Sequence, residues 1–171
     1  SELDGMSKQQ ENSPTADFVP VDLGVLVKDV ATNMTVNARK AYITLQYKVQ
    51  PVTVRGSHDL LTELVTNLCD NAIRYNQPGG HVELRCGTGP DGPWLQVEDN
   101  GIGIPAEDMP HIFERFYRAD PSHTGSGTGL GLAIAQSICQ AHHAAIRAES
   151  GQDSTTFRVE IRKEQGEHHG N

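Results

Sequence analysis

The chain has 171 residues, 36% of them hydrophobic, and a formal net charge of −8. This length predicts a single domain, and the acidic balance argues against a nucleic-acid-binding protein. Cys69, Cys86 and Cys139 form no Cys-x-x-Cys pair, and no apolar run reaches the roughly 20 residues of a membrane-spanning helix, so we expect no disulfide framework, zinc site or membrane span.

Hydrophobic periodicity and turn residues predict a mixed succession of strands and helices. The expected elements are, in order, a strand at 18–21, a helix from 23 to about 40, strands at 43–49 and 52–55, a helix at 58–75, a hairpin of strands at 81–87 and 94–98, a helix at 130–142, and paired strands at 144–150 and 155–162. Asp22 and Ser57 stand where N-caps of the first two helices belong. About three helices against a mixed sheet make an α+β fold.

The helix expected at 58–75 carries two stripes. The apolar stripe should face the core and consists of Leu61, Leu64, Val65, Leu68 and Ala72. The polar stripe spans roughly 80° of the helix surface and consists of Glu63, Asn67, Asn71 and Arg74. Asparagine is unfavourable inside a helix, whereas amide oxygens one turn apart suit magnesium, which takes oxygen ligands beside substrate phosphates. The alternative is a polar face that meets only solvent.

A second candidate follows the strand-like run at 94–98. Asp99 stands at its end, before Asn100-Gly101-Ile102-Gly103. A carboxylate there can accept a hydrogen bond from an adenine amino group, and the glycines allow close approach to a flat base. Ile102, Ile104 and Pro105 are unusually apolar for an exposed turn and suit the wall of a base pocket. The alternative is an ordinary β-turn.

A glycine-rich loop precedes the last expected helix. Its glycines are Gly125, Gly127, Gly129 and Gly131, and Leu130, Ile134, Ile138 and Ala141 share one face of the helix that follows. A helix start offers unpaired N–H groups and a partial positive charge, which favour phosphate. A bare structural turn is the alternative for this loop alone. The helix that carries the two asparagines, the turn after Asp99 and the glycine-rich loop together suit the binding of a purine nucleotide with a divalent metal.

Four motifs occur in one order along the chain: ELVTNLCDNAIRY (63–75), EDNGIGIP (98–105), HIFERFYR (111–118) and GSGTGLGL (125–132). In this order and spacing they resemble the catalytic and ATP-binding domain of bacterial two-component sensor histidine kinases, within the gyrase, heat-shock chaperone, histidine kinase and mismatch-repair ATPase superfamily. The resemblance implies a two-layer α/β sandwich (the Bergerat fold) over residues 17–163. It also implies ATP-Mg binding between the asparagine helix and a lid at about 105–126.

The resemblance assigns roles to individual residues. Asn67 and Asn71 match the paired asparagines, with Asn71 the stronger magnesium ligand. Arg74 matches a position that reaches phosphate oxygens, and Tyr75 an aromatic that stacks on adenine. The carboxylate that reads the adenine amino group is matched by Asp99. Further matches are the residues that shape the base pocket (Gly101, Gly103 and Ile104), the phenylalanines that anchor the lid (Phe113 and Phe116), a lid arginine near the γ-phosphate (Arg118), and the loop around the triphosphate (Gly127, Thr128, Gly129, Leu130 and Gly131).

Position 67 separates branches of this superfamily. The ATP-hydrolysing relatives carry a water-activating glutamate there, whereas Asn67 cannot act as a general base. Phosphoryl transfer to a protein is therefore expected rather than steady hydrolysis. Glu63, one turn earlier, is a candidate for polarising the incoming nucleophile. Non-catalytic nucleotide sensing and autonomous ATPase activity remain the alternative functions.

No histidine of this chain has the setting of a kinase phosphoacceptor, and the helical dimerisation hairpin is absent. We therefore expect a domain excised from a larger kinase, with 1–16 as a flexible remnant of the linker and 164–171 as a disordered tail. Its expected partners are ATP, the dimerisation and phosphoacceptor domain of the same kinase and, indirectly, a response regulator. The fragment is expected to be monomeric and cytoplasmic, with a membrane-anchored parent protein.

Two turns depart from the pattern of the family. Kinases of this type often have His-Gly-Gly after the last helix, where this chain has His142-His143-Ala144. Many also have a glycine before the threonine of the final strand, where this chain reads Gln152-Asp153-Ser154-Thr155. Both departures put the geometry of a turn in question rather than nucleotide binding.

Overall fold

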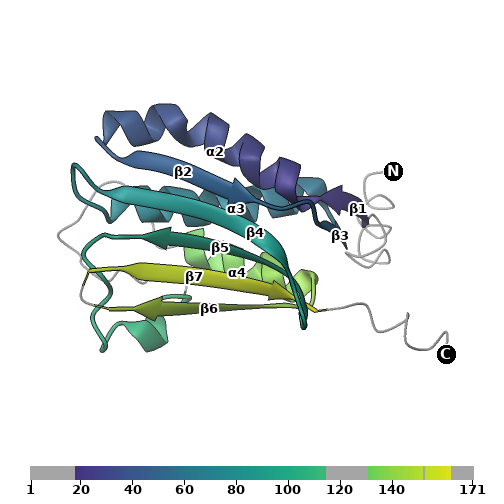
Figure 1. Cartoon of the computed structure of the whole chain (residues 1–171). Helices are drawn as coiled ribbons and strands as arrows, with labels where there is room; N and C mark the ends of the chain where they lie inside the picture. Colours follow the sequence, from purple (N-terminus) through teal and green to yellow (C-terminus); the bar gives the residue numbers. More distant parts are fainter. Residues whose placement is uncertain (1–17, 115–130, 152, 163–171) are drawn as a thin grey trace, which may run out of the picture.

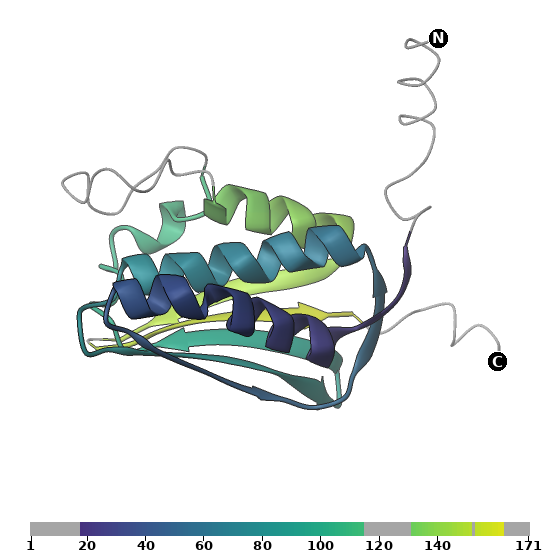
Figure 2. The same cartoon turned by 90° about the horizontal axis from the view of Figure 1, so that it is seen from above.

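The computed structural model describes residues 18–114, 131–151 and 153–162 and has two layers, three α-helices lying on one face of a five-stranded sheet (Figures 1 and 2). The helices are α2 (Leu23–Lys40), α3 (His58–Arg74) and α4 (Gly131–Ala141). The sheet runs in the order β2 (Thr44–Val49), β4 (His81–Gly89), β5 (Gly92–Asp99), β7 (Thr155–Ile161) and β6 (Ala144–Ser150). β1 (Val19–Asp22) and β3 (Thr53–Gly56) form a separate antiparallel pair. The expected α+β two-layer sandwich is confirmed.

The sheet is mixed because β2 runs parallel to β4 while the other neighbours are antiparallel. Residues alternate between the two faces, so one set packs beneath the helices and the other faces away from them. The strands contribute Val82, Leu84, Leu95, Val97, Phe157 and Val159 to the core, all nearly inaccessible to solvent. No helix among the described residues is long and apolar enough to cross a membrane.

The two expected N-caps are confirmed. The Asp22 side chain accepts a hydrogen bond from the Val25 amide, and Ser57 accepts one from the Leu60 amide. Each cap satisfies one of the donors that a helix start leaves unpaired. The apolar stripe of α3 is also confirmed, since all five of its residues are buried.

The buried face of α4 differs from the expected one. Ile138 is buried as expected, but Ile134 and Ala141 are only partly buried. The most deeply buried positions are Ala135, Ile138, Cys139 and His142. α4 packs against α3 as well as against the sheet. Two helices approach most closely where side chains are small, so the buried face of α4 includes Ala135 and Cys139 and differs from its most apolar stripe. Leu130 lies outside the described residues.

The hairpin of β4 and β5 is longer than expected. Pairing continues to Gly89 opposite Gly92, so only Pro90 and Asp91 remain between the strands. The expected limits at 87 and 94 left the Gly and Pro residues between them in the loop, but a tight two-residue connection accommodates these residues within the pairing. Gly92 adopts φ 119°, which only glycine adopts readily.

The turn after α4 explains one departure from the family pattern. His143 has φ 54°, in the left-handed region that favours glycine. His143 therefore adopts a backbone conformation that glycine would adopt without strain.

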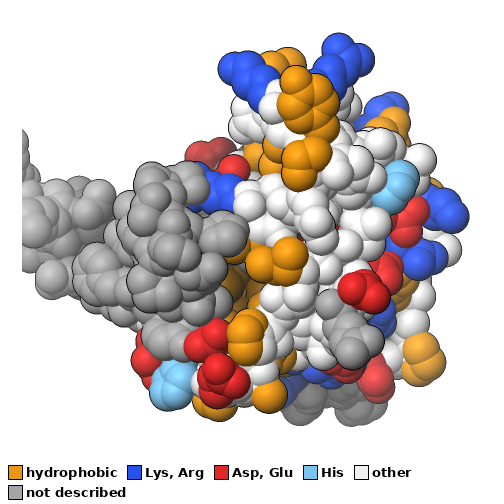
Figure 3. All heavy atoms as spheres, turned by 90° about the vertical axis from the view of Figure 1, so that its left-hand side faces the viewer, with side chains coloured by type: hydrophobic (Ala, Val, Ile, Leu, Met, Phe, Trp, Pro, Cys, Tyr) orange, Lys and Arg blue, Asp and Glu red, His pale blue; other side chains and the backbone are white. Residues whose placement is uncertain are grey.

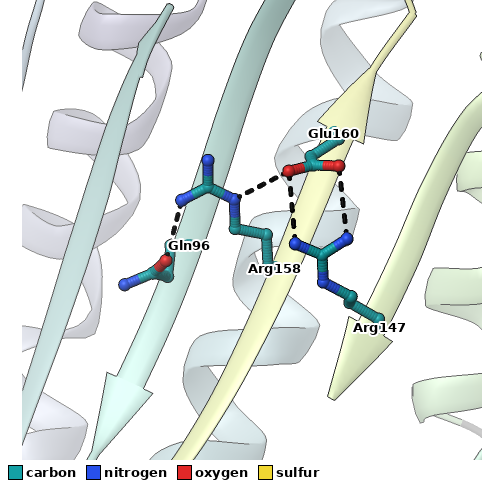
Figure 4. Close-up of polar contacts among 4 residues, drawn as sticks. All are labelled: Gln96, Arg147, Arg158 and Glu160. Atoms are coloured by element: carbon teal, nitrogen blue, oxygen red, sulfur yellow. Dashed lines mark hydrogen bonds and ion pairs between the residues drawn. The ribbon is translucent and has the colours of Figure 1, made fainter. Parts of the chain in front are cut away.

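The sheet face away from the helices carries a polar network (Figure 4). Arg158 Nη1 donates to Gln96 Oε1 at 3.0 Å, while Arg147 and Arg158 both contact the Glu160 carboxylate. The Arg158 guanidinium also lies over the Trp94 ring, 4.3 Å from its centroid. These cross-strand contacts fix the register of β5, β6 and β7 on the solvent side.

Candidate nucleotide site

Most of the candidate residues in the described segments gather at one end of the sandwich. α2 and α3 end there, α4 begins there, β5 ends at Asp99 and β7 begins at Thr155 (the left-hand end in Figure 1). Figure 3 looks onto this end, where hydrophobic side chains lie exposed among charged ones.

The polar stripe of α3 is graded in burial. Glu63 is exposed, while Asn67 and Asn71 are partly buried. The Nδ2 atom of Asn67 is buried and has no hydrogen-bond partner among the described residues. A buried donor without a partner is costly, so its retention points to a ligand that completes the site.

Arg74 lies on the same stripe and is engaged in an ion pair. Its Nε atom is 3.0 Å from Asp70 Oδ2, one helical turn earlier, and both side chains are about one-third exposed. Sequence reasoning did not single out Asp70, although an acidic residue four positions before an arginine on a helix predicts such a pair. A phosphate bound by Arg74 would share the guanidinium with Asp70.

Asp99 is a buried carboxylate at the end of β5, with only 7% of its surface exposed. One carboxylate oxygen accepts a hydrogen bond from the Gly101 amide at 2.8 Å. Burial raises the pKa of Asp99 from 3.8 to about 6, against the opposing effect of the Gly101 hydrogen bond, and the nearby Glu98 charge adds to the rise. Because Asp99 is buried and held by the Gly101 amide, its carboxylate can accept a hydrogen bond from a specific donor that reaches this buried position.

The end of α3 lies against the turn that follows Asp99. Tyr75 is the C-cap of α3, and a Cβ atom added to Gly101 would stand 2.7 Å from the Tyr75 carbonyl oxygen. Any side chain at 101 would therefore push the helix end away from Asp99. Gly103 has φ 81°, so this turn needs glycine at a second position for a conformational reason. The structure thus brings Asn71, Tyr75, Asp99 and Gly101 into one neighbourhood.

Asn76 and Asn100 tie the same region to the start of β4. The Asn100 side-chain oxygen accepts from the His81 amide at 2.6 Å, and Asn76 Nδ2 donates to the His81 carbonyl at 3.1 Å. Neither asparagine was predicted as a site residue. Their signal in the sequence was an asparagine directly after the aromatic residue and another directly after the aspartate.

The three apolar residues expected to line the base pocket do not share one environment. Ile104 is partly buried and packs against the core, whereas Ile102 is 50% exposed and Pro105 is exposed. Ile104 is therefore the one of the three that the fold holds in place. Its amide donates to the Ser150 hydroxyl at 2.6 Å, a contact that sequence reasoning missed.

The start of the expected lid is anchored on the core. A short 3-10 helix at Met109–His111 leads to Ile112, which is buried, and to Phe113. The Phe113 ring meets Phe157 edge-on, with centroids 6.3 Å apart and an interplanar angle of 82°. Gly131 begins α4. The other predicted residues of the lid and loop lie outside the described residues: Phe116, Arg118, Gly127, Thr128, Gly129 and Leu130.

The donor set fits magnesium and not a metal held by the protein alone. The described residues contain no group of three or more His, Cys, Asp or Glu side chains that could hold a metal ion. Asn71 and Asn67 offer amide oxygens, while the unpaired Asn67 atom is the amide nitrogen Nδ2, a donor that suits an anionic oxygen such as that of a phosphate. Magnesium is commonly bound by one or two protein oxygens together with substrate phosphates and water.

Comparisons with known proteins identify the family of the chain. The sequence profile described as "Histidine kinase-, DNA gyrase B-, and HSP90-like ATPase" matches residues 56–165. Sensor histidine kinase TrcS of Mycobacterium tuberculosis is 48% identical over 118 residues, which cover 66% of this chain and 23% of TrcS. Across the first relatives found, the chain spans between 23% and 30% of their length.

Two solved structures extend the likeness to the fold. The mycobacterial sensor histidine kinase MprB superposes with a TM-score of 0.75 at 29% identity, over 84% of this chain and 97% of that one. Full-length ShkA in complex with AMPPNP superposes with a TM-score of 0.75 at 26% identity, over 85% of this chain and 31% of ShkA. The chain therefore belongs to the family of histidine kinase-, DNA gyrase B- and HSP90-like ATPases, and within it to the catalytic domains of sensor histidine kinases.

Proposed function

We propose that this domain binds ATP with magnesium and donates the γ-phosphoryl group to a histidine on a separate dimerisation domain, from which a response regulator receives it. The observation that carries the proposal is the buried carboxylate of Asp99, held by the Gly101 amide beside the end of the asparagine helix. The ShkA structure, a relative of similar fold, contains a nucleotide analogue.

The base end of the nucleotide is assigned to Asp99, Gly101, Gly103, Ile104 and Tyr75. Asp99 accepts a hydrogen bond from the adenine amino group, and the absence of a side chain at Gly101 lets the turn pack directly against the Tyr75 carbonyl, which keeps the end of α3 beside Asp99. This contact discriminates against guanine, whose oxo group would face the carboxylate and leave it unsatisfied.

The phosphate end is assigned to α3 and to the start of α4. Asn71 and Asn67 would hold a magnesium ion through their amide oxygens, Arg74 would bind a phosphate oxygen, and Gly131 stands at the start of α4. Arg118 and the loop Gly127, Thr128, Gly129 and Leu130 are assigned to the γ- and β-phosphates by family resemblance. When bound, magnesium neutralises charge that develops on the phosphates during transfer.

The transfer itself needs little covalent chemistry from this domain. An imidazole nitrogen of the acceptor histidine forms a bond to the γ-phosphorus, and the bond from that phosphorus to the bridging oxygen breaks. ADP leaves with the electron pair. Glu63, exposed one turn before Asn67, is assigned to polarise the incoming imidazole N–H. Because position 67 carries an asparagine, no general base stands there to activate water.

The test is a reconstitution in trans. The chain is mixed with magnesium and ATP labelled at the γ-phosphate, together with the dimerisation hairpin of a sensor kinase relative. We expect acid-labile phosphohistidine on the hairpin, none when the acceptor histidine is replaced by alanine, and a reduced yield at limiting ATP when Asn71→Ala is used. Binding of ATP without any transfer to several hairpins would contradict the transferase assignment and favour nucleotide sensing.

A further inference from the structure

Segment 99–104 leaves the sheet at the end of β5 and needs an anchor on its far side. Asp99 is fixed at one end by strand pairing with β7, where it lies opposite Thr155. At the other end, the Ile104 amide donates a hydrogen bond of 2.6 Å to the hydroxyl of Ser150. Ser150 is the last residue of β6 and lies 46 positions further along the chain.

The Ser150 hydroxyl is engaged on all sides. Besides accepting from Ile104, its oxygen is 3.2 Å from the Ser154 carbonyl and 3.1 Å from Thr155 Oγ1. A hydroxyl has one proton and two acceptor lone pairs, so these contacts use its capacity. Thr155 is itself buried, with 5% of its surface exposed. Ser150 therefore joins Ile104 to the residue directly opposite Asp99.

The residue type at position 150 is informative. β6 places Ala144, Ile146 and Ala148 on its partly buried side, and Ser150 continues that row. An apolar residue would continue the row with more buried apolar surface. A serine at this place contributes less to the core and gains only the hydrogen bonds just described.

We propose that Ser150 is a positioning residue of the nucleotide site, which sets the distance between Ile104 and Asp99 and thereby the shape of the site that receives the base. The inference rests on the proposed function, because it concerns the binding of adenine. Ser150 acts through Ile104 and is not expected to touch the nucleotide. Its effect should accordingly appear on the base and not on the phosphates.

The experiment compares three variants of the full chain. Ser150→Ala removes the hydroxyl, Ser150→Thr keeps it on a strand-compatible residue, and Ser154→Ala is the matched control. Ser154 offers its carbonyl to the network, and its exposed side chain makes no hydrogen bond with the described residues. Each protein is titrated by calorimetry with adenosine and with ATP-Mg, and amide hydrogen exchange is followed at Ile104.

Ser150→Ala should weaken the binding of adenosine and of ATP-Mg by the same factor, about tenfold, because the partly buried Ile104 amide loses its acceptor. Ser150→Thr and Ser154→Ala should bind both ligands within about threefold of the parent. Exchange at the Ile104 amide should accelerate only in Ser150→Ala. This readout holds even if that variant is less stable, since amides of the same sheet, such as Val97, provide the internal reference.

Two results would overturn the inference. One is unchanged binding of adenosine by a folded Ser150→Ala protein. The other is a loss confined to ATP-Mg, which would move the effect of Ser150 to the phosphates. Failure of the parental chain to bind either ligand is a different outcome, because it would remove the proposed function and this inference with it.

Discussion

At the scale of single residues, Asp99 combines a stability cost with a binding role. Its pKa is raised to about 6, so the folded state holds a proton that the unfolded state releases between pH 3.8 and 6. The free energy of unfolding therefore falls as pH rises through this window. A pKa raised from 3.8 to about 6 corresponds to a loss of about 3 kcal/mol in the free energy of unfolding at neutral pH, as an upper bound.

Asp99→Asn should consequently stabilise the domain at pH 7.5, by about 1–3 kcal/mol. The amide oxygen can still accept from Gly101, while the buried charge is gone. The gain should shrink as pH falls through 6, because the parent then becomes protonated. Thermal unfolding from pH 4.5 to 8 measures this difference. An equal difference at all pH values would show that ionisation of Asp99 is not its cause.

The two asparagines of α3 are predicted to act on the phosphate end. Asn71→Ala should weaken ATP-Mg by about tenfold and leave adenosine nearly unchanged, because the metal bridges protein oxygens to phosphates. Asn67→Ala should show the same selectivity with a smaller loss. Calorimetry with both ligands separates the possibilities. Loss of adenosine binding to the same extent would assign that residue to packing instead.

At the scale of elements, His142 connects the end of α4 to the start of α3. Its Nε2 atom accepts from the Ser57 amide at 3.1 Å, and Nδ1 lies 2.8 Å from the Ile138 carbonyl. The ring stacks on Phe18 at 4.4 Å, and a Cβ atom at Gly56 would stand 2.6 Å from it. Only the neutral ring, protonated at Nδ1, satisfies both hydrogen bonds.

Burial lowers the pKa of His142 below 6.5, while the Ile138 hydrogen bond opposes this effect and the neighbouring His143 adds to it. Stability from this contact is thus fully present above pH 6.5 and is lost as pH falls toward the lowered pKa. His142→Gln should lower the free energy of unfolding at pH 7.5 by about 1–2 kcal/mol. It should also flatten the decline in stability below pH 6.5.

The control is His143→Gln, at an exposed position directly beside His142. It should reduce the parental slope of stability against pH only slightly, because His143 is the smallest of the three influences on the pKa of His142. Thermal unfolding of both variants between pH 5 and 8 provides the comparison. If His143→Gln flattened the slope as much as His142→Gln, the titration would belong to another group.

Local chemistry in the sequence was enough to predict some of these elements. Asp22 and Ser57 were recognisable as caps because a cap depends on residues three positions apart. The contacts of Ser150 and His142 were not predictable in this way. Ile104 and Ser150 are 46 positions apart, and Ser57 and His142 are 85 apart, so only the packed fold brings each pair together.

In the candidate site, too, only features with a local sequence signal could be predicted. Asp99 and Gly101 stood out because an aspartate followed by spaced glycines at a strand end is a local pattern. The burial of α4 was misjudged because its neighbour α3 decides which face is covered. The position of the β4–β5 hairpin was predicted correctly, but its strands were predicted too short. Strand ends depend on pairing with the neighbouring strand, which a single sequence does not reveal.

At the scale of the whole molecule, the domain should bind ATP and hydrolyse it slowly. The nucleotide end offers an amide at position 67 where ATPases of the superfamily carry a carboxylate base. Phosphate release from ATP-Mg should be close to background and should remain low in Asn67→Glu, because the water must also be positioned. Rapid magnesium-dependent release by the parental chain would favour an autonomous ATPase.

The central claim is that the buried carboxylate at the end of β5 reads an adenine base. The most direct measurement is calorimetric titration of the parental chain and of Asp99→Asn with ATP-Mg and GTP-Mg at pH 7.5. We predict that the parent binds ATP-Mg at least about tenfold more tightly than GTP-Mg, and that Asp99→Asn loses most of this preference. Equal affinity of the parental chain for the two nucleotides would contradict the account.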